Sequence, residues 1–225
     1  MPAWSFYSQN MLLCAITDRR LLGEEEHQRR DALLGLAQTW ARGGVDYIQI
    51  REKDLRPPEL LSLARSLASA VREEQPEGSG RPTRILLNGA PEVALEAGAD
   101  GVHLTGSAAP GAAAMAEDVY ARAGRQAIIS RSCHSAEEAR RAGQVSLILF
   151  APVYEKAFTR EQPLPGQGLA ALAEACRAAP HTPVLALGGI TAGNAPACLQ
   201  AGARGVAAIR LFLTGEWHSL RESSL

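Results

Sequence analysis

Short apolar runs alternate with longer amphipathic stretches along most of the chain. Eight of the runs are dominated by aliphatic residues, a pattern that predicts strands buried on both faces. These runs cover residues 11–17, 47–52, 84–89, 101–104, 127–134, 147–154, 183–189 and 205–210. Each is followed by a stretch with helical character, so the pattern predicts eight strand–helix units in series.

The stretches between the strands carry recognisable helix signals. Residues 31–44 have apolar positions at helical spacing and end on two glycines, and residues 57–74 open with two prolines before a clear 3.6-residue period. Ser135 precedes two acids, as a helix N-cap should. Residues 169–179 and 193–202 are expected to form later helices.

Eight such units in 225 residues predict an α/β protein with a single (β/α)₈ TIM barrel. We expect one domain over residues 1–225, with a barrel core at about 11–213. The alternative is an open doubly wound sheet, but the first strand runs into ITDRRLL, without the glycine-rich turn typical of that fold. The segment 73–83 is rich in Pro, Gly and Ser and is expected to be a surface loop.

Composition narrows the range of partners. The formal net charge of −1 gives no basic excess for nucleic acid or an anionic membrane, so we expect a small-molecule partner and leave a homo-oligomer open. No apolar stretch approaches the ~20 residues of a membrane span, and the N-terminus lacks a signal-peptide pattern. The four cysteines have no zinc-binding spacing. A cytoplasmic protein with reduced thiols is therefore expected.

Candidate chemistry lies where barrel strands end, since that edge carries function in this fold. Alternation sends Gln49, Arg51 and Lys53 to one side of the second strand, which predicts a cationic, hydrogen-bonding surface for an anion. The alternative is an ion pair between Arg51 and a glutamate that only braces the barrel.

Two further strand ends favour phosphate binding. Gly188 and Gly189 end the seventh strand, and backbone N–H groups near Ile209 and Arg210 follow the eighth, as in the usual barrel phosphate site. The long loop after the sixth strand carries Lys156 and is interpreted either as a lid over an anion or as a solvated surface loop.

The fifth strand ends with polar residues that alternation brings to one face. Ser132 and His134 share that face, and a histidine there is a candidate general acid or base. It could equally cap the next helix or hydrogen-bond a loop carbonyl. Cys133 lies on the other face, and without an evident partner base it is not expected to be a nucleophile.

Taken in order, QIREKD, LLN, GADGVHL, S-x-H, APVY, LGGI-x₃-N and GVAAI resemble the thiamine phosphate synthase family and its thiazole tautomerase (TenI-type) relatives. The resemblance covers nearly the whole chain and implies a transferase of thiamine biosynthesis. The synthase joins an aminopyrimidine diphosphate to a thiazole phosphate; diphosphate leaves first, and the thiazole nitrogen captures the pyrimidine cation.

The resemblance also implies roles for particular residues. Those implied to bind the pyrimidine diphosphate are Gln49, Arg51, Lys53 and Asn88. Those implied to surround the thiazole phosphate are Gly188, Ile209 and Arg210. Ser132 matches a substrate-contacting serine, and His134 matches the proton-transfer histidine of the tautomerase branch.

Departures from the family pattern leave the reaction open. Mg²⁺ is expected for the family, yet Gly89 and Ala108 stand where the family has its two aspartate ligands, so no metal ligand is assigned. A synthase with altered ligands is the first hypothesis. A thiazole tautomerase using His134 and a non-catalytic barrel that binds thiazole phosphate are the alternatives, and an unrelated phosphate-binding barrel ranks last.

Overall fold

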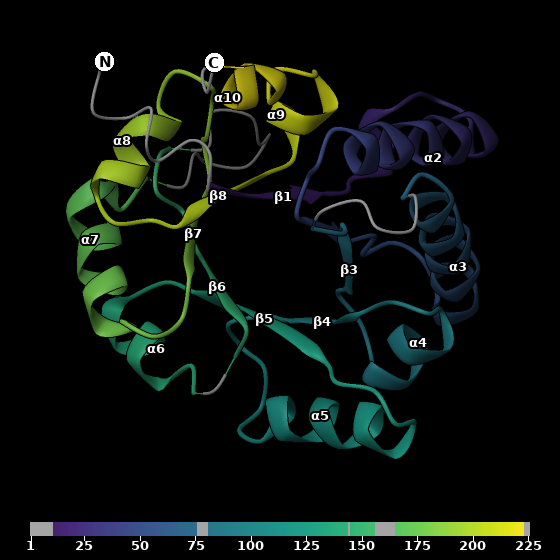
Figure 1. The fold of residues 1–225 in the computed structure, drawn as a ribbon, viewed down its shortest axis with the longest axis horizontal. Coiled ribbons are helices and arrows are strands. Elements are labelled where there is room, and N and C mark those ends of the chain that lie inside the picture. The colour runs from purple at the N-terminus through teal and green to yellow at the C-terminus, as the bar shows by residue number, and fades with distance from the viewer. Residues whose placement is uncertain (1–10, 76–80, 144, 156–164, 223–225) are drawn as a thin grey trace. The chain divides into compact units, whose positions relative to one another are not determined.

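The structure is a computed structural model that describes residues 11–75, 81–143, 145–155 and 165–222. Its eight strands close into a barrel in chain order, which confirms the predicted (β/α)₈ fold (Figure 1). The strands are β1 (Leu12–Ile16), β2 (Tyr47–Ile50), β3 (Arg84–Leu87), β4 (Gly101–Leu104), β5 (Ile128–Cys133), β6 (Leu147–Phe150), β7 (Val184–Leu187) and β8 (Gly205–Ala208). Pairing is parallel, with Gln49 opposite Leu86 and Phe150 opposite Ala186.

The helices follow the strands as the sequence predicts. They are η1 (Arg19–Leu21), α2 (Glu26–Arg42), α3 (Pro57–Glu73), α4 (Pro91–Glu96), α5 (Ala112–Arg122), α6 (Ala136–Arg141), α7 (Gly168–Ala178), α8 (Ala195–Gln200), α9 (Arg210–Leu213) and α10 (His218–Glu222). Most strands stop one to four residues before their predicted ends, because the residues there leave the ladder and form loops. Arg210 accordingly starts α9 instead of ending β8.

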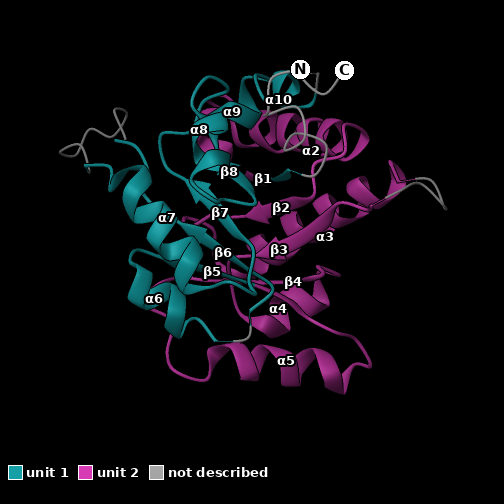
Figure 2. Ribbon diagram, turned by 60° about the vertical axis from the view of Figure 1, so that its left-hand side comes forward, with its two compact units in different colours: residues 1–14, 130–225 teal, residues 15–129 magenta. Residues whose placement is uncertain are grey.

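Two compact units divide the chain, with boundaries inside β1 and β5 (Figure 2). In the unit Ala15–Ile129, α2 packs on α3 and buries Trp40 and Leu33, while α3 buries Leu63. In the other unit, α6 packs on α7. The expectation of one domain over residues 1–225 stays a prediction. Of the predicted surface loop at 73–83, residues 76–80 lie outside the described part of the chain.

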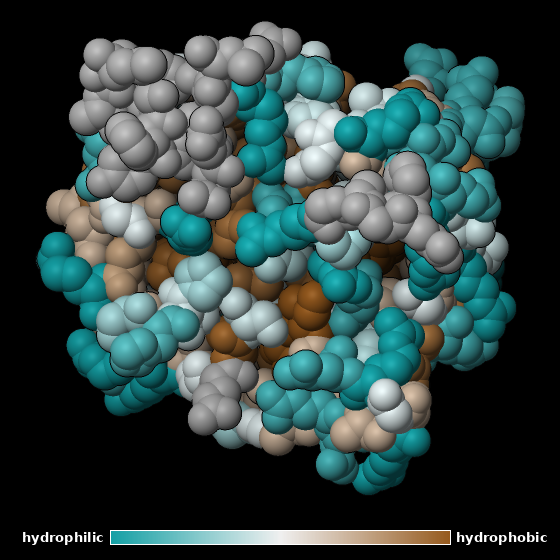
Figure 3. Space-filling view, in the orientation of Figure 1, coloured by the Kyte–Doolittle hydropathy of each residue, from teal (hydrophilic) through white to brown (hydrophobic). Residues whose placement is uncertain are grey.

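The strands form the core. Every residue of β1, β4, β6 and β8 is buried, which agrees with strands covered on both faces. Hydrophilic side chains gather on the outer surface over α2 and α3 (Figure 3). No helix among the described residues is long and apolar enough to cross a membrane.

Candidate functional site

The carboxyl end of β2 carries a buried amide followed by a guanidinium. The backbone there is fixed from the end of β1: Thr17 N–H donates to the Gln49 carbonyl, and Arg51 N–H donates to Thr17 Oγ1, each at 3.0 Å. Gln49 is 2% exposed, and its Oε1 has no hydrogen-bond partner among the described residues. Lys53 lies exposed in the turn beyond the strand, where alternation no longer sets its direction. A shared orientation of all three side chains stays a prediction.

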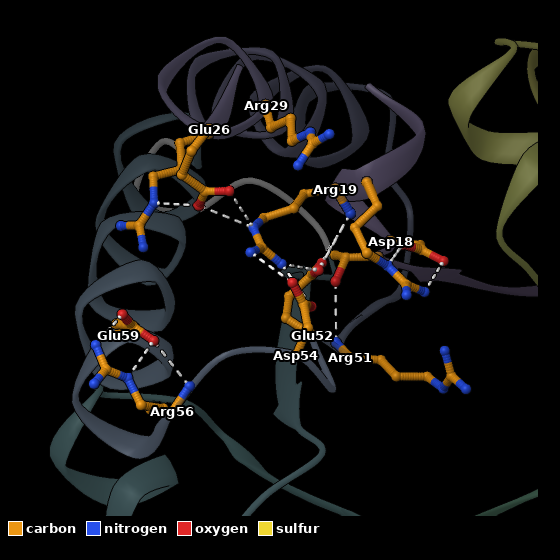
Figure 4. Close-up of polar contacts among 12 residues, drawn as sticks. Asp18, Arg19, Glu26, Arg29, Arg51, Glu52, Asp54, Arg56 and Glu59 are labelled. Atoms are coloured by element: carbon orange, nitrogen blue, oxygen red, sulfur yellow. Dashed lines mark hydrogen bonds and ion pairs between the residues drawn. The ribbon is translucent and has the colours of Figure 1, made fainter. Parts of the chain in front are cut away.

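Three carboxylates surround the buried guanidinium of Arg19, and together they form what we call the Arg19 cluster (Figure 4). Nη1 and Nη2 donate to the two Asp54 carboxylate oxygens at 2.9 Å each, and Nη1 also donates to Glu52 Oε2 at 3.1 Å. Nε donates to Glu26 Oε1 at 3.0 Å, and the Arg19 backbone N–H donates to both Glu52 oxygens at 3.2 Å. The cluster therefore ties the segments that follow β1 and β2 to the start of α2.

The bracing ion pair that the sequence offered as an alternative for Arg51 is formed by Arg19. Glu52 is paired with Arg19, and Arg51 forms no ion pair with any residue that the structure describes. The Arg51 side chain extends away from the Arg19 cluster (Figure 4). Hydrogen bonds from Arg19 lower the pKa of Asp54, so this carboxylate stays ionised and attached to the cluster.

A buried histidine lies within electrostatic reach of the Arg51 guanidinium. His103 on β4 is 5% exposed. Burial, and secondly the positive charge of Arg51, lower the His103 pKa to about 4, so the imidazole is neutral near pH 7. The sequence placed His103 on the fourth strand but gave it no role.

The ends of β3 and β4 do not offer a set of metal ligands. Asn88 is partly exposed and its N–H donates to the Ile50 carbonyl at 2.9 Å. Gly89 and Ala108, where the resemblance implies aspartates, supply no side-chain oxygen. The described residues contain no group of three or more His, Cys, Asp or Glu side chains that could hold a metal. Mg²⁺ prefers carboxylate oxygens, so these residues do not fit a protein-held Mg²⁺.

The glycine pair after β7 is required by close packing within the chain. Gly188 and Gly189 have φ of 98° and 63°, a region that favours glycine. A Cβ on Gly188 would lie 2.9 Å from the Pro152 Cα, and one on Gly189 would lie 2.7 Å from the Tyr154 Cβ. The segment after β6 therefore presses directly on the segment after β7. Lys156, further along that first segment, lies outside the described residues.

The loop that follows this pair is closed by an asparagine. Asn194 Oδ1 accepts from Thr191 N–H, and Asn194 Nδ2 donates to the Gly189 carbonyl, each at 2.9 Å. Neither Gly189 N–H nor Ile209 N–H forms a hydrogen bond with other described residues, and Arg210 is exposed at the start of α9. Asn194 is part of the LGGI-x₃-N motif but was not among the predicted site residues. Phosphate binding by these groups stays a prediction.

The end of β5 holds the candidate acid–base residue. Ser132 is partly exposed and His134 is exposed beyond the strand. His134 Nδ1 lies 2.7 Å from the Ala151 carbonyl oxygen, and His134 N–H donates to Glu138 Oε2 at 2.7 Å. The loop-carbonyl contact that the sequence proposed as an alternative is therefore present. Burial raises the pKa of Cys133 to about 11, so its thiol is protonated and a poor nucleophile.

Polar groups that have no partner among the described residues, at the carboxyl ends of barrel strands, are typical of a (β/α)₈ enzyme that acts on a small anionic substrate. The model of the thiamine monophosphate synthase family matches residues 13–212. The chain therefore belongs to this family of thiamine-biosynthesis enzymes, whose substrates are small phosphorylated compounds.

Individual relatives agree with that assignment. The chain is 34% identical over 206 residues to a thiamine-phosphate synthase of Roseiflexus sp., covering 91% of this chain and 79% of that protein. It is 38% identical over 201 residues to a Geobacter sulfurreducens protein provisionally named a thiamine-phosphate synthase, covering 88% and 84%. A solved Pyrococcus furiosus thiamine phosphate pyrophosphorylase has a TM-score of 0.74 at 24% identity, with 96% of each chain covered, which supports the fold.

Proposed function

We propose that this protein joins an aminopyrimidine diphosphate to a thiazole phosphate, giving thiamine phosphate and free diphosphate. The carrying observation is the end of β2, where the buried Gln49 Oε1 has no partner among the described residues and Arg51 has no ion pair among them. Such groups are unfavourable unless a ligand supplies a donor and a negative charge. An aminopyrimidine diphosphate carries both, in its amino group and its diphosphate.

The proposed step needs charge stabilisation more than it needs a base. The bond between the pyrimidine methylene carbon and the diphosphate oxygen breaks, and its electron pair leaves with diphosphate. The lone pair of the thiazole nitrogen then forms the new carbon–nitrogen bond. Arg51 and Lys53 would meet the charge that grows on the departing diphosphate, an electrostatic role suited to fixed cations. Asn88 would add a hydrogen bond from its amide.

Thiazole phosphate is assigned to different groups in this proposal. The backbone N–H groups of Gly189 and Ile209, unbonded within the described residues, are suitable phosphate donors, and Arg210 would add a positive charge. Ser132 is proposed to contact substrate, and Lys156 to contribute a further cation. We further propose that the reaction takes place in the cytoplasm, in keeping with four cysteines that form no disulfide.

A second candidate, thiazole tautomerisation, is favoured by one contact. Because the Ala151 carbonyl can only accept, the 2.7 Å contact implies a proton on His134 Nδ1 and leaves Nε2 of the neutral ring as a base. For a tautomerase, His134→Asn should lower turnover by about 10²–10⁴-fold with nearly unchanged thiazole-phosphate affinity. For the synthase the same change should be much milder, because cation formation depends on diphosphate departure.

The deciding experiment gives the protein both synthase substrates with Mg²⁺ and measures thiamine phosphate and released diphosphate in single-turnover reactions. The thiazole tautomer is tested in parallel without the pyrimidine. The proposal expects stoichiometric thiamine phosphate and diphosphate. Tautomer conversion without coupling would favour the second candidate, and ligand binding without either product would leave a non-catalytic barrel.

A further inference from the structure

The segment after β2 places acids beside the cations that the proposed function uses. Arg51, Glu52, Lys53 and Asp54 follow one another directly. A guanidinium beside free carboxylates tends to pair with them, and a paired guanidinium is less available to a ligand. Another residue must therefore hold Glu52 and Asp54, so that they do not pair with the Arg51 guanidinium in place of the ligand.

Arg19 has the contacts that are required to hold both acids. Its side chain is 4% exposed and that of Glu52 is 1% exposed, so this pair is shielded from water. Asp54, whose side chain is 40% exposed, is held by two parallel hydrogen bonds at 2.9 Å. Such bidentate contacts are among the strongest and most directional that a carboxylate makes. Both acids next to Arg51 are thus bound on the side away from its guanidinium (Figure 4).

The backbone contacts point the same way. Arg19 N–H donates to both oxygens of Glu52, so Glu52 is held by the main chain as well as by the guanidinium. Thr17, two residues earlier, receives the Arg51 N–H. In the short segment after β1, Thr17 therefore fixes the Arg51 backbone. Arg19, in the same segment, holds the neighbouring carboxylates away from the Arg51 guanidinium.

We propose that Arg19 is a positioning residue for anion binding: by holding Glu52 and Asp54, it keeps the Arg51 guanidinium available to the diphosphate of the substrate. Arg19 itself is buried among acids and does not touch the ligand. The inference rests on the proposed function, because that function names diphosphate as the anion.

The test removes Arg19 without leaving a buried charge uncompensated. In Arg19→Gln/Glu52→Gln the buried cation and its buried acid are lost together, while Asp54 loses its partner and can reach Arg51. We expect the Kd for inorganic diphosphate to rise by about tenfold or more, and KM for the pyrimidine diphosphate to rise more than kcat falls. Adding Asp54→Asn should restore the Kd to within about threefold of wild type. Asp54→Asn alone is the control and should leave the Kd unchanged.

The rescue by Asp54→Asn separates this role from a structural one, since loss of a brace would not be repaired by removing a further contact. A folded double variant with wild-type affinity, or one not rescued by Asp54→Asn, would overturn the proposal. If the double variant does not fold, Arg19→Lys with and without Asp54→Asn gives the same comparison, because lysine keeps the charge but cannot hold both acids. Diphosphate binding is measured without turnover, so a protein that passes these tests yet makes no thiamine phosphate contradicts the proposed function alone.

Discussion

The end of β2 and the end of β7 are both proposed to bind a phosphorylated substrate, but they are built in opposite ways. The β2 end depends on side-chain charge: Arg51 has no ion pair among the described residues, and Arg19 holds the neighbouring Glu52 and Asp54. The β7 end depends on backbone: Gly188 and Gly189 adopt positive φ and press against the segment after β6.

The difference separates binding from stability. At the β2 end, changing Arg51 should alter ligand affinity and leave the fold intact, because Arg51 forms no ion pair with the described residues. At the β7 end the same two glycines serve packing and the proposed phosphate site, so changes there should act first on stability. Four predictions test this contrast.

The largest effect is expected from Gly189→Ala. Alanine at φ of 63° is strained, and its Cβ would lie 2.7 Å from Tyr154 Cβ and 2.8 Å from the Glu155 carbonyl oxygen. Together these should lower the free energy of unfolding by about 2–5 kcal/mol. Gly193→Ala is the matched control in the same loop, since its Cβ would meet only Thr191 Oγ1 at 3.9 Å. Chemical denaturation of both variants checks the prediction, and equal stabilities would contradict the packing role.

A pH effect of about 3 kcal/mol is expected on the β2 side from His103. Its folded pKa is about 4, against about 6.5 in an unfolded chain. Between these values the unfolded state binds a proton that the native state does not. The free energy of unfolding is therefore highest above about pH 6.5. It decreases as the pH falls from about 6.5 to about 4, and His103 causes no further change below that. Denaturation at several pH values should show this slope in wild type and not in His103→Gln; an identical slope in both would exclude His103 as its source.

Arg51→Ala should weaken binding of inorganic diphosphate by about 1.5–3 kcal/mol while changing the unfolding free energy by less than ~0.5 kcal/mol. The reason is that Arg51 has no ion pair among the described residues, whereas its guanidinium would pair with the negative charge of the ligand. Arg65→Ala removes the same charge from an exposed pair with Glu96 and serves as the control. Calorimetric titration measures the affinity. Unchanged affinity with a less stable fold would make Arg51 a brace after all.

The smallest effect concerns the metal. Gly89→Asp combined with Ala108→Asp should raise Mg²⁺ affinity and synthase rate by about tenfold, or ~1.4 kcal/mol. The atoms nearest to a Cβ on Gly89 would be in the side chains of Leu87 and Leu60, at 3.3 and 3.4 Å, so a small adjustment admits it. Ordinary Mg²⁺-dependent turnover by the unmodified protein, with no gain in the variant, would show that these two positions do not limit the reaction.

Sequence patterns predicted the features that depend on local order. The eight strands follow from short aliphatic runs, and Ser135 caps its helix as predicted, with Oγ accepting Glu138 N–H at 3.1 Å. Gln49 is buried, but so are Ile48 and Ile50 on the other face of β2, so the direction of its side chain stays a prediction. Alternation could not be extended to Lys53, because the ladder stops at Ile50 and a turn begins.

The features that were missed depend on contacts between distant residues. Arg19 lies 33 and 35 positions from Glu52 and Asp54. In the sequence, local pattern does not distinguish it from other arginines in loops. A usable signal existed: the acids next to Arg51 require a cation from a neighbouring strand end, and Arg19 follows the adjacent strand. The close packing of Gly189 on Tyr154 likewise joins residues 35 positions apart, so the glycine pair could be read only as a ligand contact.

The contrast between the two strand ends is tested most directly by an NMR titration of labelled protein with each substrate separately. Aminopyrimidine diphosphate should shift the Gln49 side-chain amide and the Arg51 Nε–H signals. Thiazole phosphate should shift the backbone N–H signals of Gly189 and Ile209 and leave the first set almost unchanged. If both ligands shift the same set, or if the diphosphate leaves Arg51 unaffected, then the side-chain end and the backbone end do not divide the two substrates between them.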